Sequence, residues 1–168
     1  MARILVVYYS RTGRTHDVAL TIARGCGADT ERIYDARPRG GLRGWIRSAW
    51  EAVLQRPAGI LATNRNPADY DLVILGSPVW VGHLSSPMRR YLNTHCADIA
   101  RAALFVTEGG RGGSGALAEM ADYCEGSPLA TVELRDEDLG SSVSRRLDAF
   151  VERIRKAVSV SQTKEQYL

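Results

Sequence analysis

The chain has 168 residues, of which 45% are hydrophobic and 24% are charged. This size and balance predict one compact soluble domain, residues 1–168, whose core needs no disulfide or structural metal. The three cysteines show no C-x-x-C spacing, which argues against a secreted disulfide framework and against a zinc site, and no apolar run is long enough for a membrane span. We therefore expect a cytoplasmic protein with reduced thiols and no bound metal.

The net charge of +3 is modest, and every basic residue except Lys156 and Lys164 is an arginine. Neither lysine follows a glycine, which excludes a Walker-type phosphate loop because that loop needs a Gly-Lys-Ser/Thr step. We expect no nucleic-acid partner for a chain with so small a net charge.

Short apolar runs alternate with longer segments of helical periodicity, which predicts repeated strand and helix units packed into a mostly parallel sheet. The predicted strands are residues 3–9, 30–34, 72–76, 102–107 and 130–134. The predicted helices are residues 13–25, 42–55, 86–93, 114–124 and 142–158. The polar tail, residues 159–168, is expected to fray.

The composition of the strands predicts their order in the sheet. In the first, third and fourth strands, residues 4–9, 72–75 and 102–106 are apolar throughout, as strands covered on both faces must be. The second and fifth strands mix polar and apolar residues and suit the edges. A five-stranded parallel sheet of order 2-1-3-4-5 satisfies this, with helices on both faces in a three-layer α/β/α sandwich. Its topological switch lies between the first and third strands, where a ligand crevice is expected.

A loop of hydroxyl residues and a glycine follows the first predicted strand, at the turn into a helix. Ser10, Thr12 and Thr15 can donate hydrogen bonds to phosphate oxygens, and Gly13 permits a tight turn. The free N–H groups of the first helical turn point to the same place. The loop therefore predicts an anion cradle; the alternative is a Ser/Thr-rich helix cap that binds nothing.

The second loop follows the third predicted strand, on the other side of the expected crevice. Its sequence over residues 76–82 is Gly-Ser-Pro-Val-Trp-Val-Gly, which predicts a turn. Trp80 on such a turn is well placed to stack on a flat aromatic ligand, although it could instead fold back over a helix. A phosphate cradle and a stacking ring together favour a phosphorylated aromatic cofactor. His83, beside this loop, is the one histidine placed to contact a substrate.

The third loop, residues 107–113, follows the fourth predicted strand and is rich in glycine, so its backbone can approach a ligand closely. Gly110, Gly112 and Gly115 match the dinucleotide fingerprint G-x-G-x-x-G literally. The match lies on the fourth unit and lacks the following acidic residue, so a flexible rim loop is the favoured interpretation.

Together the S-x-T-G-x-T, Gly-Ser-Pro-Val-Trp and Thr-x-Gly-Gly motifs resemble those of the flavodoxin-like family, in order and spacing over nearly the whole chain. The chain looks like a short, single-domain member, either a flavodoxin or an NAD(P)H:quinone oxidoreductase of that fold. The resemblance implies that the first loop holds the FMN phosphate and that the other two wrap the isoalloxazine ring. The cofactor-binding residues it implies are Ser10, Arg11, Thr12, Gly13, Arg14, Thr15, Ser77, Pro78, Val79, Trp80, Thr107, Glu108, Gly109 and Gly110.

Several departures from the family pattern bear on function. The family often has Asn where Arg14 stands, so Arg14 either contacts the phosphate or faces solvent. The third loop has no tyrosine to stack on the second face of the flavin, which leaves that face to a substrate. Glu108 and Arg111 lie where their charges could tune the flavin. No catalytic residue is assigned.

Charge is the largest departure, since electron-carrier flavodoxins are typically acidic and this chain has a sequence pI of about 8.9. The Arg-rich segment 32–65 is either a solvated helix face or a surface for an acidic protein, an anionic substrate or the NADPH phosphate. We expect an FMN-dependent NAD(P)H oxidoreductase that passes electrons to a quinone or similar small acceptor. The alternatives are an electron carrier between protein partners and a partner-binding module without flavin, which the hydroxyls of the first loop disfavour. Oligomeric state is left open.

Overall fold

The computed structural model describes residues 2–36, 59–135 and 141–165. Its centre is a sheet of parallel strands in the order β2-β1-β3-β5-β6, with β4 paired antiparallel to β3. The strands are β1 (Ile4–Tyr9), β2 (Asp29–Ile33), β3 (Leu72–Trp80), β4 (His83–Leu84), β5 (Ala102–Glu108) and β6 (Thr131–Arg135). The predicted order 2-1-3-4-5 of the parallel strands is therefore confirmed.

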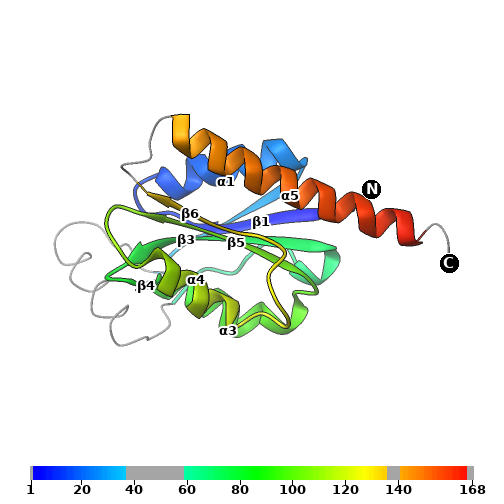
Figure 1. Cartoon of the computed structure of the whole chain (residues 1–168). Coiled ribbons are helices and arrows are strands. Elements are labelled where there is room, and N and C mark those ends of the chain that lie inside the picture. Colours follow the sequence, from blue (N-terminus) through cyan, green and yellow to red (C-terminus); the bar gives the residue numbers. More distant parts are fainter. Residues whose placement is uncertain (1, 37–58, 136–140, 166–168) are drawn as a thin grey trace.

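Helices cover both faces of this sheet, as expected for a three-layer sandwich (Figure 1). The described helices are α1 (Arg14–Cys26), α3 (Ser86–His95), α4 (Gly113–Ala121) and α5 (Ser141–Glu165), with short 3₁₀ turns at Pro67–Asp69 and Cys96–Asp98. Helices α1 and α5 lie on one face, and α3 and α4 lie on the other. The predicted helix 42–55, with most of the Arg-rich segment, lies outside the described residues.

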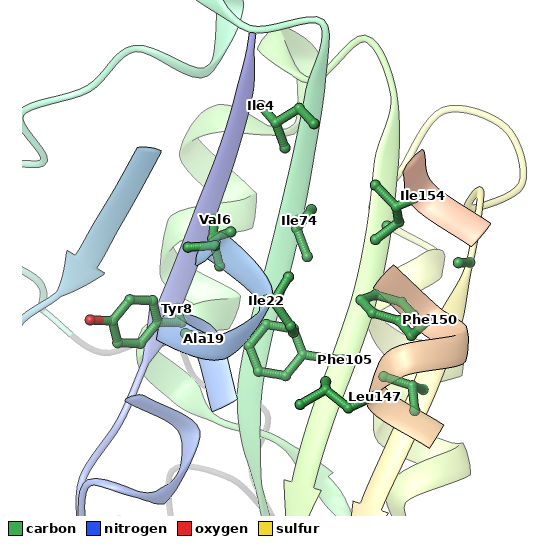
Figure 2. Close-up of a cluster of buried hydrophobic side chains, with 14 of the residues drawn as sticks. Ile4, Val6, Tyr8, Ala19, Ile22, Ile74, Phe105, Leu147, Phe150 and Ile154 are labelled. Carbon is green, nitrogen blue, oxygen red and sulfur yellow. The ribbon is translucent and has the colours of Figure 1, made fainter. Parts of the chain in front are cut away.

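The hydrophobic core divides into two clusters, one on each face of the sheet. Strands β1 and β5 are buried along their whole length, because successive side chains point alternately to the two helical layers. Figure 2 shows the cluster on the α1 and α5 side, where Ile22 of α1 and Phe150 of α5 pack with Val6 of β1 and Phe105 of β5. This sheet positions the loops at the carboxyl ends of its strands.

Two boundaries differ from the predictions by more than three residues, and the short strand β4 was not predicted. Strand β3 does not end at Gly76 but runs to Trp80, and it folds back as the β3–β4 hairpin through Val81 and Gly82. The prediction of a turn at residues 76–82 was wrong at its start, because glycine and proline also fit an extended strand near its end, where fewer ladder bonds are required. Helix α5 reaches Glu165, so most of the tail expected to fray is helical; no Gly or Pro interrupts it.

In the part of the chain that the structure describes, none of the helices is both long enough and apolar enough to cross a membrane.

Candidate functional site

The first loop leaves the end of β1 and turns directly into α1. Gly13 is the N-cap of α1 with a φ of 102°, a left-handed conformation that a residue with a Cβ adopts only at a cost. Its N–H donates to Ser10 Oγ at 3.2 Å, so Ser10 closes the turn from inside. The N-cap makes no side-chain hydrogen bond to the helix, and the first-turn N–H groups of a helix are backbone donors that suit an anion.

The second loop is the tip of the β3–β4 hairpin. Val81 and Gly82 both have positive φ values, 50° and 79°, as a two-residue hairpin turn of type I′ requires. Trp80 is half-buried, and its ring meets that of Tyr9 edge to face, with 5.5 Å between the ring centroids. The hairpin therefore holds the tryptophan beside the end of β1, where the first loop begins.

The third loop joins β5 to α4. Gly109 and Gly110 are exposed, and Gly112 has a φ of 108°. A Cβ on Gly112 would lie 2.4 Å from Gly82 Cα, so the third loop packs backbone to backbone against the hairpin tip. A glycine is required at this position both for the conformation and for the close approach.

These three loops meet around one cavity of about 290 Å³ at the carboxyl ends of β1, β3 and β5. This is the crevice predicted at the topological switch point. Thr15 Oγ1 of α1 and Thr107 Oγ1 of β5 are 2.9 Å apart and join the first and third loops directly. The residues that line the cavity are Arg11, Thr12, Arg14, Thr15, Pro78, Val79, Trp80, Thr107 and Gly109. The structure thus brings together most of the predicted site residues.

Five predicted site residues do not line this cavity: Ser10, Gly13, Ser77, Glu108 and Gly110. Ser10 and Gly13 shape the first loop through their mutual hydrogen bond. Ser77 is fully buried, with its Oγ 2.8 Å from that of Ser85, and it accepts the Ser85 N–H. Glu108 is also buried, on the face of β5 toward α4. The side chains of Ser10, Ser77 and Glu108 therefore support the loops from within, whereas Gly110 is exposed.

Glu108 belongs to a carboxylate cluster at the edge of the sheet. Its Oε1 accepts from Arg135 Nε at 2.9 Å, and Arg135 also donates to Glu133 at 2.8 Å. Burial raises the pKa of Glu108, and the neighbouring Glu133 raises it further. Burial also acts to raise the pKa of Glu133, but hydrogen bonds from Arg135 and Glu108 outweigh it and lower that pKa overall.

Positive charge gathers on the side of the cavity formed by the first loop. Arg11 and Arg14 both line it. Behind them, Arg32 donates from its Nη2 to the Ser10 carbonyl oxygen at 3.2 Å. A cavity with hydroxyl groups, an open helix N-terminus and guanidinium groups at one end suits an anionic group such as a phosphate.

The residues that hold the loops from outside the cavity were not predicted from the sequence. Glu119 of α4 accepts the Leu84 N–H of the hairpin at 3.0 Å and the Nε of buried Arg89 of α3 at 2.8 Å. His83 Nδ1 lies 3.7 Å from the same carboxylate, so His83 is directed toward α4. Tyr9 was missed too, although its place at the end of β1 could have indicated it. No sequence signal pairs Arg89 with Glu119, which only the packing of α3 on α4 brings together.

Within the described residues, His, Cys, Asp and Glu side chains form no group of three that could hold a metal ion.

No family model matches the chain. Among solved structures, the chain is similar to a flavoprotein of Lactobacillus acidophilus in complex with FMN, with 21% identity and a TM-score of 0.66 over 87% of this chain and 99% of that one. It is also similar to a flavodoxin, WrbA-like protein from Agrobacterium tumefaciens, with 18% identity and a TM-score of 0.58 over 93% of this chain and 99% of that one.

A third similar structure is the rubredoxin oxygen:oxidoreductase of the anaerobe Desulfovibrio gigas, with 15% identity and a TM-score of 0.63. There the match covers 95% of this chain but 37% of the other, so the whole of this fold corresponds to one part of a larger protein. These similarities, together with the strand order, show that the chain has the flavodoxin-like fold.

Proposed function

We propose that this chain binds FMN in the cavity between the loops that follow β1, β3 and β5 and acts as an NAD(P)H-dependent oxidoreductase. The observation that carries the proposal is the convergence of the predicted phosphate loop, the Trp80 hairpin and the third loop on one cavity of about 290 Å³. The residues fit the group, because one end of the cavity offers hydroxyl and guanidinium donors and the other offers an aromatic ring.

Each part of the cavity has a separate task in this proposal. Thr12 and Thr15 donate hydrogen bonds to the phosphate, together with the N–H groups at the start of α1, and Arg11 and Arg14 neutralise its charge. Trp80 provides the flat apolar surface for the ring, and the edge of Tyr9 holds the indole in place. FMN, when bound, supplies one- and two-electron redox chemistry, and the protein positions it and controls access to it.

The lining of the cavity supports an enzyme more than a carrier. Trp80 is the one aromatic side chain among the described lining residues, and the third loop contributes only Thr107 and Gly109 there. In this proposal no second ring covers the other face of the flavin, and that face receives a nucleotide donor and then a quinone or similar small acceptor.

Flavin binding is tested by titrating the flavin-free protein with FMN and following the quenching of flavin fluorescence. Trp80→Ala is expected to weaken binding about tenfold, since stacking contributes about 0.5 to 1.5 kcal/mol beyond burial and apolar contact is lost as well. Tyr123→Ala, which removes a half-buried ring outside this cavity, is the matched control and should bind FMN like the wild type. Equal affinity of Trp80→Ala and wild type would remove the stacking role, and absence of FMN binding by the wild type would refute the proposal.

Anaerobic titration of the FMN-loaded protein with NADPH separates the two redox roles. Loss of the visible flavin absorption within seconds is expected for a reductase. Retention of the absorption with the flavin still bound would favour the electron carrier, which receives its electrons from another protein.

A further inference from the structure

A charge that tunes the flavin would have to face the cavity, and Glu108 does not line it. Its side chain is 1% exposed, and both carboxylate oxygens are engaged inside the protein. Oε1 accepts from Arg135, and Oε2 accepts the N–H of Gly113, the first residue of α4, at 2.8 Å. The carboxylate therefore bonds across the third loop, between Glu108 and Gly113, and it does not line the cavity.

The hydrogen bond from Gly113 to Glu108 spans the third loop. Residues 109–112 connect the end of β5 at Glu108 to the start of α4 at Gly113, so this one bond closes the loop at its base. It also satisfies an N–H of the first turn of α4, whose N-cap, Gly112, provides no side-chain bond. A negative charge at a helix N-terminus is favourable in addition.

Helix α4 in turn contacts the β3–β4 hairpin that bears Trp80. At its start, Gly112 packs on the backbone of Gly82 at the hairpin tip. Two turns later, Glu119 accepts the Leu84 N–H of β4. A shift of α4 relative to β5 would therefore move both the hairpin wall and the third-loop wall of the cavity.

We propose that Glu108 is a positioning residue that fixes α4 on the sheet edge and thereby sets the second and third walls of the flavin cavity. The proposal rests on the proposed function for the cofactor's identity, but the contacts that carry it belong to the chain alone. Glu133 and Arg135 of β6 face the same carboxylate, and Arg146 of α5 lies behind Glu133. The start of α4 also packs closely on the Glu133 side chain, because a Cβ on Gly113 would lie 2.5 Å from the Glu133 carboxyl carbon.

Three variants separate the bond to Gly113 from the rest of the cluster. Glu108→Ala removes the acceptor, Glu108→Gln retains one acceptor oxygen for the Gly113 N–H, and Glu133→Gln alters the cluster without touching that bond. In the flavin-free protein, amide hydrogen exchange at Gly113 is expected to be at least about tenfold faster in Glu108→Ala than in wild type, and close to wild type in the other two. Unchanged Gly113 exchange in Glu108→Ala would overturn the proposal whether or not the protein binds FMN.

The effect on the cavity is measured with the same variants. Amide chemical shifts of Trp80 and Gly82 are expected to change in flavin-free Glu108→Ala and to stay near wild-type values in Glu133→Gln. FMN binding should weaken about tenfold in Glu108→Ala and by no more than about threefold in Glu108→Gln. Unchanged Trp80 and Gly82 shifts, or unchanged FMN affinity in a variant that has lost Gly113 protection, would refute the positioning role. Absence of FMN binding by the wild type refutes the proposed function, and the amide shifts then decide the positioning role on their own.

Discussion

Gly76 of β3 lies directly under an aromatic ring, and its replacement by alanine tests the packing next to the site. It pairs with Phe105 of β5, whose ring is fully buried and covers the space where a side chain at position 76 would lie. A Cβ built on Gly76 would lie 2.0 Å from Cζ, 2.3 Å from Cε1 and 2.7 Å from Cε2 of that ring. Ordinary contacts between such carbons are about 3.5 to 4.0 Å, so the added methyl overlaps three ring atoms.

The loss of folding free energy in Gly76→Ala depends on how far the Phe105 ring can move away from the added methyl group. Phe105 is packed against Ile22 and other side chains of the core below α1 and α5 (Figure 2), so its ring cannot leave without opening a void. Overpacking a core of this kind costs typically 1 to 3 kcal/mol, and the depth of this overlap places Gly76→Ala at about 3 kcal/mol or more. For a domain of this size the melting temperature should fall by roughly 6 to 12 °C.

Urea unfolding followed by circular dichroism measures this free energy, and a second variant identifies its cause. Phe105→Leu alone should be destabilising because it removes buried ring atoms. In the double variant the smaller side chain admits the new methyl, so the combined loss should be smaller than the sum of the single losses by at least about 1 kcal/mol. A Gly76→Ala protein within about 0.5 kcal/mol of wild type, or strictly additive losses, would refute this account of the packing.

Two further predictions concern the chain outside the flavin cavity. Arg89→Met should cost about 3 kcal/mol in chemical denaturation because it leaves the Glu119 carboxylate without its buried partner. Arg89→Met with Glu119→Met should recover part of this loss, since the Leu84 N–H and carbonyl groups still lose the partners that Glu119 and Arg89 provide. Equal losses in the single and double variants would count against the ion pair. Burial raises the pKa of the Cys26 thiol from 9.0 to about 11, so in a Cys96→Ser, Cys124→Ser background it should react with iodoacetamide at pH 8 about a hundredfold more slowly than an unfolded control, at a rate that rises with pH. The neutral thiol is the favoured form, so its contribution to stability is complete below about pH 9 and is lost as the pH rises through about 11. Alkylation at the control rate would show that the thiol is not buried in solution.

Much of the fold follows from local sequence pattern. The uninterrupted apolar runs of β1 and β5 require cover on both faces, and the mixed pattern of β2 and β6 suits an edge, so the order of the parallel strands could be predicted. The parallel order then places the ends of β1, β3 and β5 together, which is why loops far apart in sequence could be assigned to one crevice. Gly13 was identified because a tight turn into a helix requires a residue without a Cβ.

Only the tertiary structure decided which side chains face the crevice and which support it. Glu108 was expected near the flavin, yet the pleat of β5 turns it toward α4, while the preceding Thr107 faces the cavity and meets Thr15, 92 residues away in sequence. Position in a motif specifies that a residue lies at the end of a strand, but one residue of register changes the face to which its side chain points. The partners of Glu108 come from β6 and α4, and such pairings depend on how separate elements pack, which no local pattern encodes.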